Sequence, residues 1–321
     1  MKIWRICVCA ALTCSLLACA SPVQSASLTV ITWNAARLEG TDLEGFGKYV
    51  RKIKPDVVVL QELLDKKQVE RLIQQAGISH WNARLSNFSK DSIKKPSKKL
   101  EVAILSPHEI GTVFEADPYM DADTKEMHVR EVELRVPLFV PKDQHRNKGL
   151  RGWLWVEIPT LKIAVAAIHL KSAGGENGKR DELNSFKREN VVAALADKIV
   201  NDSRKRKEWS YLVAGDFNVA PGDVNKVGVD LDLRCKAQDQ CLQYDQTHAI
   251  LSSGLVQGLA MRNLTVGLGR SFVDPQYAAS PIDNIYATGP FFDETSKLIA
   301  ERSAAFGSDH YAIRVTVGTE K

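Results

Sequence analysis

Short apolar runs alternate with amphipathic segments over most of the chain. The stretches Leu28 to Trp33 and Val57 to Leu60 are apolar and rich in β-branched residues, which favours strands. Between them, Phe46 to Ile53 repeats its apolar residues at helical spacing, and Lys54-Pro55-Asp56 breaks that helix. The same criteria predict helices over 68–76 and 182–199 and strands over 102–105, 152–158, 163–170, 209–214 and 312–317.

Two connections are also marked in the sequence. Gly77 is expected to cap the end of helix 68–76, and Pro159-Thr160 to turn the chain between two strands of a hairpin. The mixed pattern continues without an internal repeat, a low-complexity block or an apolar stretch long enough to span a membrane. It predicts one α/β domain over 28–321, and two sheets packed face to face and flanked by helices fit the pattern.

Composition narrows the class of protein but not its substrate. Hydrophobic residues make up 44% of the chain and charged residues 26%, which is ordinary for a globular protein and unlike a disordered one. The net charge of +4 includes Lys2 and Arg5 of an N-terminal leader, so the remaining chain is only weakly basic. Such a balance is compatible with nucleic acid as a partner and does not require it.

Residues 1–19 have the pattern of an export signal. Lys2 and Arg5 precede an apolar stretch over 6–18, which is shorter than the roughly 20 residues of a membrane helix. The sequence Leu16-Leu17-Ala18-Cys19 resembles the lipobox of bacterial lipoproteins, which implies acylation of Cys19 and a membrane anchor. Cleavage after Ala20 is the alternative, and it would release the protein. Residues 20–27 then form a short tether, and we expect a periplasmic or cell-surface lipoprotein or a secreted protein.

Cysteine usage agrees with export. Four of the six cysteines lie in the leader, which leaves Cys235 and Cys241 in a polar, loop-like stretch. An oxidising compartment favours a disulfide between these two. A zinc site is the alternative, but two thiols without nearby histidines make a poor one. Two free thiols are less expected outside the cytoplasm.

Acidic, amide and imidazole side chains stand at the ends of several predicted strands. Polar groups at strand ends tend to gather at one rim of a sheet, where loops form sites. We therefore expect one site built from Asn34, Glu62, His169, Asp216, Asn218, Asp283, Asp309 and His310.

These residue types suit the chemistry of phosphate esters. Hard cations such as Mg²⁺ and Mn²⁺ prefer oxygen ligands, and Glu62 offers a carboxylate and Asn34 a neutral carbonyl. If the strand continues beyond Asp216, Asn218 lies on the same face, where one side chain could activate water and the other contact phosphate. A protonated His310 would stabilise negative charge at phosphorus. Each residue alone also has an ordinary explanation as a cap, a turn or a surface pair.

The order of these motifs along the chain identifies a family more specifically than any single motif does. Thr32-Trp33-Asn34, Gln61-Glu62, His169-Leu170, Gly215-Asp216-Phe217-Asn218, Ile282-Asp283 and Ser308-Asp309-His310 resemble, in order and spacing, the endonuclease/exonuclease/phosphatase superfamily. The resemblance runs from about residue 28 to residue 317. It implies an α/β fold, namely a four-layer α-β-β-α sandwich of two mainly antiparallel sheets flanked by helices, and Mg²⁺-dependent hydrolysis by an activated water.

The same resemblance implies a role for each side chain. Asn34, Glu62 and Asp309 would bind the metal. Asp216 would orient the attacking water and Asn218 would position the phosphate. His310, paired with Asp283, would stabilise the transition state. Arg151 and Lys171 would contact the phosphate.

His169 narrows the comparison within the superfamily. Pancreatic-type deoxyribonucleases and sphingomyelinases carry histidine at this position, whereas abasic-site nucleases carry tyrosine. A histidine there would act near the leaving group as a general acid or hydrogen-bond donor. Glu101 is a candidate to orient it. Asn284 departs from relatives that often have an aromatic residue or histidine, which concerns substrate contacts and not the metal site.

The leading hypothesis is an extracytoplasmic nuclease. Lys171, Lys179, Arg180 and the lysine-rich segment 94–99 would then contact backbone phosphates, although a solvated loop is the commoner meaning of such a segment. The alternative is a lipid or small-molecule phosphoesterase of the sphingomyelinase or inositol-phosphatase kind. The anchor favours this alternative, but the sequence contains no extended apolar loop that could enter a membrane. A non-catalytic binding module is disfavoured because no ligand is missing. No protein partner is indicated, and a monomer is expected.

Overall fold

The structure is a computed structural model. It describes residues 27–87, 100–116, 151–172, 182–221, 245–253, 258–273, 281–293 and 296–318, apart from the side chains of 182, 183, 185, 186 and 190. The predictions that fall outside these residues concern the leader with Cys19, segment 94–99, Lys179, Arg180, Cys235 and Cys241. Within the described ranges, no helix combines the length and apolar character that crossing a membrane requires.

Sheet A has the strand order β11-β12-β1-β2-β4-β3. β1 and β2 run parallel, and every other pair of neighbours in this sheet is antiparallel. The strands are β1 (Ser27–Asn34), β2 (Val57–Leu63), β3 (Asn82–Leu85), β4 (Glu101–Ser106), β11 (Lys297–Arg302) and β12 (Ile313–Gly318).

Sheet B has the order β5-β6-β7-β8-β10-β9. Here β7 and β8 are the parallel pair, and the remaining pairs are antiparallel. The strands are β5 (Val113–Ala116), β6 (Trp153–Ile158), β7 (Ile163–His169), β8 (Ser210–Asp216), β9 (Arg262–Asn263) and β10 (Asp283–Thr288). Each sheet therefore contains one parallel pair whose strands end on the same side.

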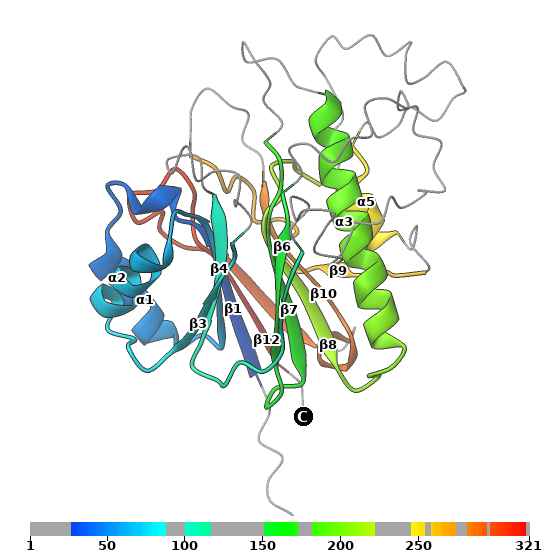
Figure 1. Ribbon diagram of the computed structural model, residues 1–321, viewed down its shortest axis with the longest axis horizontal. Helices are drawn as coiled ribbons and strands as arrows, with labels where there is room; N and C mark the ends of the chain where they lie inside the picture. Colours follow the sequence, from blue (N-terminus) through cyan, green and yellow to red (C-terminus); the bar gives the residue numbers. More distant parts are fainter. Residues whose placement is uncertain are drawn as a thin grey trace, which may run out of the picture.

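Helices cover the outer faces of both sheets (Figure 1). α1 (Leu43–Ile53) and α2 (Lys66–Ala76) pack on sheet A, and α3 (Glu182–Ser203) and α5 (Thr247–Ser252) pack on sheet B. Short 3₁₀ turns are η1 (Ala36–Leu38) and η7 (Pro290–Phe292). Asp42 and Asp65 cap the first two helices by accepting hydrogen bonds from Gly45 and Gln68. Gly77 ends α2 in the left-handed conformation, as expected.

Alternation along the strands separates the core into layers. Leu28 and Val30 of β1 face the space between the sheets, whereas Ile31 and Trp33 face α1 and α2. On sheet B, Val165 likewise faces the space between the sheets. A separate set of buried residues faces α3. Helix, sheet, sheet and helix thus form the four layers of the predicted α-β-β-α sandwich.

Candidate active site

Strand direction brings the chemistry-bearing residues to one rim. Asn34 and Glu62 lie at the ends of the parallel pair β1 and β2, and His169 and Asp216 end the parallel pair β7 and β8. Asn34 Nδ2 lies 3.2 Å from Glu62 Oε1 in its own sheet and 3.2 Å from Asp216 Oδ2 across the sandwich. The two sheets therefore contribute to a single cluster.

Asn34 takes part in this cluster as a hydrogen-bond donor. Its carbonyl oxygen accepts from the backbone N–H of Ala36 at 3.1 Å. Its amide nitrogen faces Glu62 and Asp216 and lies 3.4 Å from His310 Nε2. In this structure the amide nitrogen of Asn34 faces the carboxylates, and the expectation that Asn34 binds a metal stays a prediction.

Glu62 is the most accessible carboxylate of the cluster. Its side chain is 25% exposed, against 2% for Asp216 and 0% for Asp283. The residue has a φ of 59°, in the left-handed region, where the pairing of β2 with β4 shifts register. Such a conformation costs a non-glycine residue about 1–3 kcal/mol. The surrounding sheet thus holds Glu62 in a conformation that a free chain avoids.

Asp216 and Asn218 are linked by a sharp turn. Asp216 ends β8, so the condition under which Asn218 would share its strand face is not met. Asn218 has a φ of 56° and folds back, so that its backbone N–H donates to Asp216 Oδ1 at 2.7 Å and its amide to Oδ2 at 3.1 Å. Burial, together with the charge of Asp283, raises the pKa of Asp216 to about 7 against the opposing effect of His310.

Asp283 and His310 form a buried pair. His310 Nδ1 lies 2.8 Å from Asp283 Oδ2, and its Nε2 lies 4.0 Å from Asp216 Oδ2. Burial lowers the pKa of His310, but the charges of Asp283 and Asp216 and the hydrogen bond that His310 donates to Asp283 outweigh it and raise that pKa to about 10. This raised pKa favours the cationic form of the imidazole at neutral pH, with Nε2 on the side of Asp216.

His169 has the opposite electrostatic character. Its Nε2 lies 3.5 Å from Asp216 Oδ2 and 3.7 Å from Glu62 Oε1. Complete burial, followed by the positive charges of Arg151, His310 and Lys171, holds the pKa of His169 well below its usual range. A neutral imidazole donates a hydrogen bond but is a weak proton source, which favours the donor role over that of general acid.

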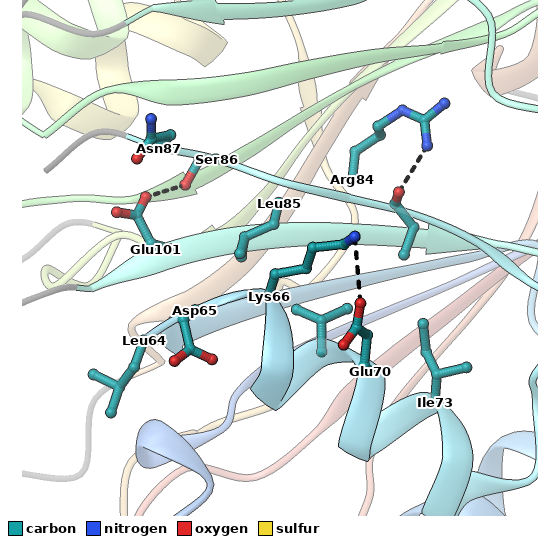
Figure 2. A pocket seen from close by; sticks show the side chains of 12 residues that line it. Leu64, Asp65, Lys66, Glu70, Ile73, Arg84, Leu85, Ser86, Asn87 and Glu101 are labelled. Atoms are coloured by element: carbon teal, nitrogen blue, oxygen red, sulfur yellow. Dashed lines mark hydrogen bonds and ion pairs between the residues drawn. The ribbon is translucent and has the colours of Figure 1, made fainter. Parts of the chain in front are cut away.

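Glu101 does not orient His169, contrary to expectation. His169 Nδ1 has no hydrogen-bond partner among the described residues. The Glu101 carboxylate instead accepts from the Ser86 hydroxyl at 2.5 Å, on the outer face of sheet A (Figure 2). The two residues line a hollow of about 550 Å³ beside α2, which contains none of the predicted site residues. The sheet lies between the two groups because β4 directs Glu101 away from sheet B.

Three further predicted residues lie around the cluster. Asp309 is exposed, and its Oδ1 is 3.3 Å from the Ser308 hydroxyl. Arg151 donates to the carbonyl of Leu170 at 2.9 Å and thus braces the chain just after His169. Lys171 belongs to the same connection. Arg151 therefore supports the site through the backbone, and its expected contact with phosphate stays a prediction.

The sequence did not predict the residues of α5 that support the turn after β8 from the helical layer. His248 of α5 stacks on Phe217 with ring centroids 4.9 Å apart, and its Nε2 donates to the carbonyl of Val219 at 2.8 Å. Its Nδ1 lies 2.7 Å from the Tyr286 hydroxyl. His248 thus contacts Phe217 and Val219, which alternate along the turn with the site residues Asp216 and Asn218. No pattern in the sequence marks α5, which is only six residues long.

A buried ion pair supports the neighbouring connection. Arg188 of α3 contacts Asp245 Oδ2 at 2.5 Å and donates to the carbonyl of Lys171 at 2.7 Å. Asn284, which departs from the family pattern, is buried, and its oxygen accepts from Asn263 and Thr265. It therefore ties β10 to the strand beside it and is not directed at a substrate.

The cluster fits a bound divalent cation. Three carboxylates, those of Glu62, Asp216 and Asp283, meet here around the imidazole of His310. Asp216, Asp283 and His310 each bring a ligand atom within 4.8 Å of the others. The 2.8 Å hydrogen bond already occupies the facing atoms of Asp283 and His310, so Glu62 is the carboxylate best placed to receive a cation from solvent.

Two packed sheets with this cluster at one rim match a family whose members are phosphate-ester hydrolases. The chain belongs to the endonuclease/exonuclease/phosphatase family, whose model matches residues 31–310. That range contains every predicted site residue from Asn34 to His310. The sequence matches no curated protein.

Solved structures agree with the family. Truncated TDP2 from Caenorhabditis elegans is similar with a TM-score of 0.55 and 16% identity, over 91% of this chain and 98% of that one. An AP endonuclease from Archaeoglobus fulgidus gives 0.55 and 16%, over 90% and 98%. A 3′ phosphatase from Neisseria, bound to a product DNA hairpin, gives 0.56 and 18%, over 92% and 100%. At these identities the likeness establishes the fold.

Proposed function

We propose that the protein is an exported, metal-dependent phosphodiesterase that hydrolyses nucleic acid. The observation that carries the proposal is the Asp283–His310 pair, which places a buried cationic imidazole 4.0 Å from the carboxylate of Asp216. A fixed positive charge beside a carboxylate suits the hydrolysis of a phosphate ester, where negative charge accumulates on the phosphoryl oxygens.

Glu62, with Asp309 at the rim, would hold Mg²⁺ or Mn²⁺, which when bound supplies positive charge to the phosphate and favours attack by water. Asp216, with its pKa raised to about 7, would accept a proton from the attacking water. The amide of Asn218 keeps the Asp216 carboxylate oriented. His310 would stabilise the charge that develops on phosphorus, and neutral His169 would donate a hydrogen bond on the side of the leaving group.

Nucleic acid is the favoured substrate for two reasons. The similar structures include an AP endonuclease and a 3′ phosphatase bound to DNA. Arg151 and Lys171 also bring positive charge to the rim, since both lower the pKa of His169. The alternative is a lipid or small-molecule phosphoesterase, to which the predicted anchor at Cys19 gives some support. A periplasmic or surface location, a disulfide between Cys235 and Cys241 and a monomeric state complete the proposal.

The test is hydrolysis by purified protein of plasmid DNA, single-stranded DNA, RNA, sphingomyelin and an inositol phosphate. We expect cleavage of a nucleic acid with Mg²⁺ or Mn²⁺ and none with EDTA. The matched variant His310→Gln should fold and lose turnover. A folded, metal-loaded protein that leaves every nucleic acid intact would contradict the nuclease assignment, and turnover of a lipid or inositol phosphate would support the alternative.

A further inference from the structure

The described chain begins at the end of the sandwich opposite the candidate active site. β1 and β2 are parallel and reach the site at Asn34 and Glu62, so Ser27, the first residue of β1, lies at the far end of sheet A. β7 and β8 are also parallel and reach the site at their last residues. Each of these two strands has seven residues, so about 20 Å of sheet separates the two ends.

Basic side chains surround the first residue of β1. Lys297 and Ser27 both pair with Gly318 of β12. On the other side of β1, Lys54 ends α1 just before Asp56, whose carboxylate accepts from the N–H of Thr29 at 2.8 Å. Both lysines are exposed.

Sheet B brings further cations to the same end. The carbonyl of Lys162 accepts from the N–H of Ser210, the first residue of β8. The basic run 204–207 leads into this strand from the end of α3. The backbone N–H of Phe291 in η7 donates to the Ser210 hydroxyl at 2.9 Å, and the Phe291 side chain packs against the inter-sheet core. The exposed cations of this basic end are Lys54, Lys162, Arg204, Lys205, Lys207 and Lys297.

Among the described residues of this end, exposed acidic side chains are fewer than exposed basic ones. The exposed acidic residues at the same end of the described chain are Glu109, Glu208 and Asp293. Arg206 lies within the basic run but is paired with Glu157 and Asp202, and its guanidinium stacks 4.2 Å above the ring of Trp209. A half-buried tryptophan among lysines and arginines is typical of surfaces that meet lipid headgroups.

We propose that this basic end docks on an anionic lipid surface, with the candidate active site facing away from that membrane. The length of the preceding chain supports this orientation. Cys19, the predicted point of acylation, is eight residues before Ser27, a span of at most about 28 Å. Bringing the site to the same membrane would require the tether to run beside about 20 Å of sheet at close to full extension. The basic charges favour the orientation in which the basic end meets the membrane, and this orientation does not require an extended tether.

This orientation refines the substrate class and rests on the proposed function. A site that opens away from the membrane receives phosphate esters from the aqueous phase, such as nucleic-acid fragments. Lipids of the same membrane lie at the other end of the protein. The proposal therefore favours a soluble polymeric substrate over a membrane lipid.

The test measures vesicle binding by the chain from Ser21 to Lys321, which contains every described element. We expect it to bind vesicles of phosphatidylethanolamine and phosphatidylglycerol, to release with added salt, and not to bind phosphatidylcholine vesicles. The variant Arg204→Glu/Lys205→Glu/Lys207→Glu should bind at least about tenfold more weakly. The matched control Lys48→Glu/Lys66→Glu/Lys67→Glu changes the same charge on exposed positions of α1 and α2 and should bind like the wild type.

A second measurement reports which end meets the lipid. Brominated phosphatidylglycerol should quench tryptophan fluorescence, and Trp209→Phe should reduce that quenching. Absence of vesicle binding, equal loss in both triple variants, or quenching that does not depend on Trp209 would overturn the proposal. A basic-end variant that loses affinity for single-stranded DNA but keeps its vesicle binding would identify a nucleic-acid surface instead. None of these readouts requires enzymatic activity, so failure of the proposed function leaves them interpretable.

Discussion

The Nδ1 atom of His310 lies 2.8 Å from Oδ2 of Asp283, and both side chains are buried. Water screens such a pair only weakly, so the carboxylate outweighs the effect of burial and raises the pKa of His310 to about 10. The pair therefore maintains a positive charge beside Asp216 over the whole physiological pH range.

Replacing Asp283 by Asn should remove this charge while preserving the shape of the side chain. Without the carboxylate the pKa of His310 falls, and we expect kcat to decrease by about 100-fold or more at neutral pH. Activity that needs the protonated imidazole is lost as pH rises through its pKa. The alkaline limb of the pH–kcat profile should accordingly move to lower pH. Asp293→Asn, an exposed position at the opposite end, is the matched control, and an unchanged alkaline limb in Asp283→Asn would refute the assigned role.

Asp216 should make the metal-free protein less stable at neutral pH than at acid pH. Its folded pKa of about 7 exceeds the unfolded value of about 3.9, so the folded state binds more protons between them. The contribution of Asp216 to the free energy of unfolding is fully present below pH 4 and is lost as the pH rises toward 7. In EDTA, Asp216→Asn should therefore equal the wild type near pH 4 and exceed it near pH 7 by about 1–3 kcal/mol.

Urea unfolding at several pH values between 4 and 7 checks this prediction. Added Mg²⁺ should stabilise the wild type at neutral pH by mass action, and more so than the variant. A variant that is uniformly less stable than the wild type at every pH would show that Asp216 is structural and carries no uncompensated charge.

The sequence predicts the frame of the fold because the frame depends on local pattern. The β-branched runs at Leu28 to Trp33 and Val57 to Leu60 are strands, and Gly77 ends its helix. The site follows from the frame, since residues at the ends of parallel strands meet at one rim. The four site residues at the ends of these strands are Asn34, Glu62, His169 and Asp216.

Tertiary constraints explain what the sequence does not show. β10 begins with Asp283 and Asn284, two residues unfavourable to strands, and exists because β8 pairs with it. The left-handed conformation of Glu62 carries no local signal, and that of Asn218 carries only the weak preference of asparagine for this region. His248 is likewise invisible as a support, because its partners come from segments far apart in the chain.

Glu62→Gln should chiefly impair the use of metal. The side chain keeps its size but loses the charge that a divalent cation requires, so the Mg²⁺ concentration for half-maximal activity should rise by about tenfold or more. The free energy of unfolding in EDTA should change little, because the side chain is partly exposed. Metal titration of activity and of thermal stability measures both effects. Glu70→Gln on α2 is the matched control, and an unchanged Mg²⁺ requirement in Glu62→Gln would contradict the assignment of Glu62 as the principal ligand.

Gly215 should be irreplaceable because of the close approach of two strands. It has a φ of 148°, and a Cβ atom there would lie 1.9 Å from the carbonyl oxygen of Ile168 on β7. Gly215→Ala is therefore expected to separate β7 from β8 and to destabilise the protein by about 3 kcal/mol or more. Gly318→Ala, where a Cβ meets nothing within 4 Å, should be close to neutral. Thermal unfolding of both variants makes the comparison, and equal stability would show that the strands adjust.

His248 should position the catalytic turn without touching the substrate. Its stacking on Phe217 and its hydrogen bond to Val219 fix the turn in which Asn218 adopts a left-handed conformation. We expect His248→Ala to lower kcat by about tenfold or more while KM changes little, because the turn that holds Asp216 and Asn218 loses its outer support.

Two further variants separate positioning from general stability. His248→Gln can still donate to the carbonyl of Val219 and accept from Tyr286, so it should recover most of the lost kcat. Tyr286→Phe removes only the hydroxyl that meets Nδ1 and should reduce kcat less than His248→Ala does. If His248→Ala lowered the melting temperature while the enzyme that remained folded kept full kcat, the residue would stabilise the fold alone and would have no role in positioning the turn.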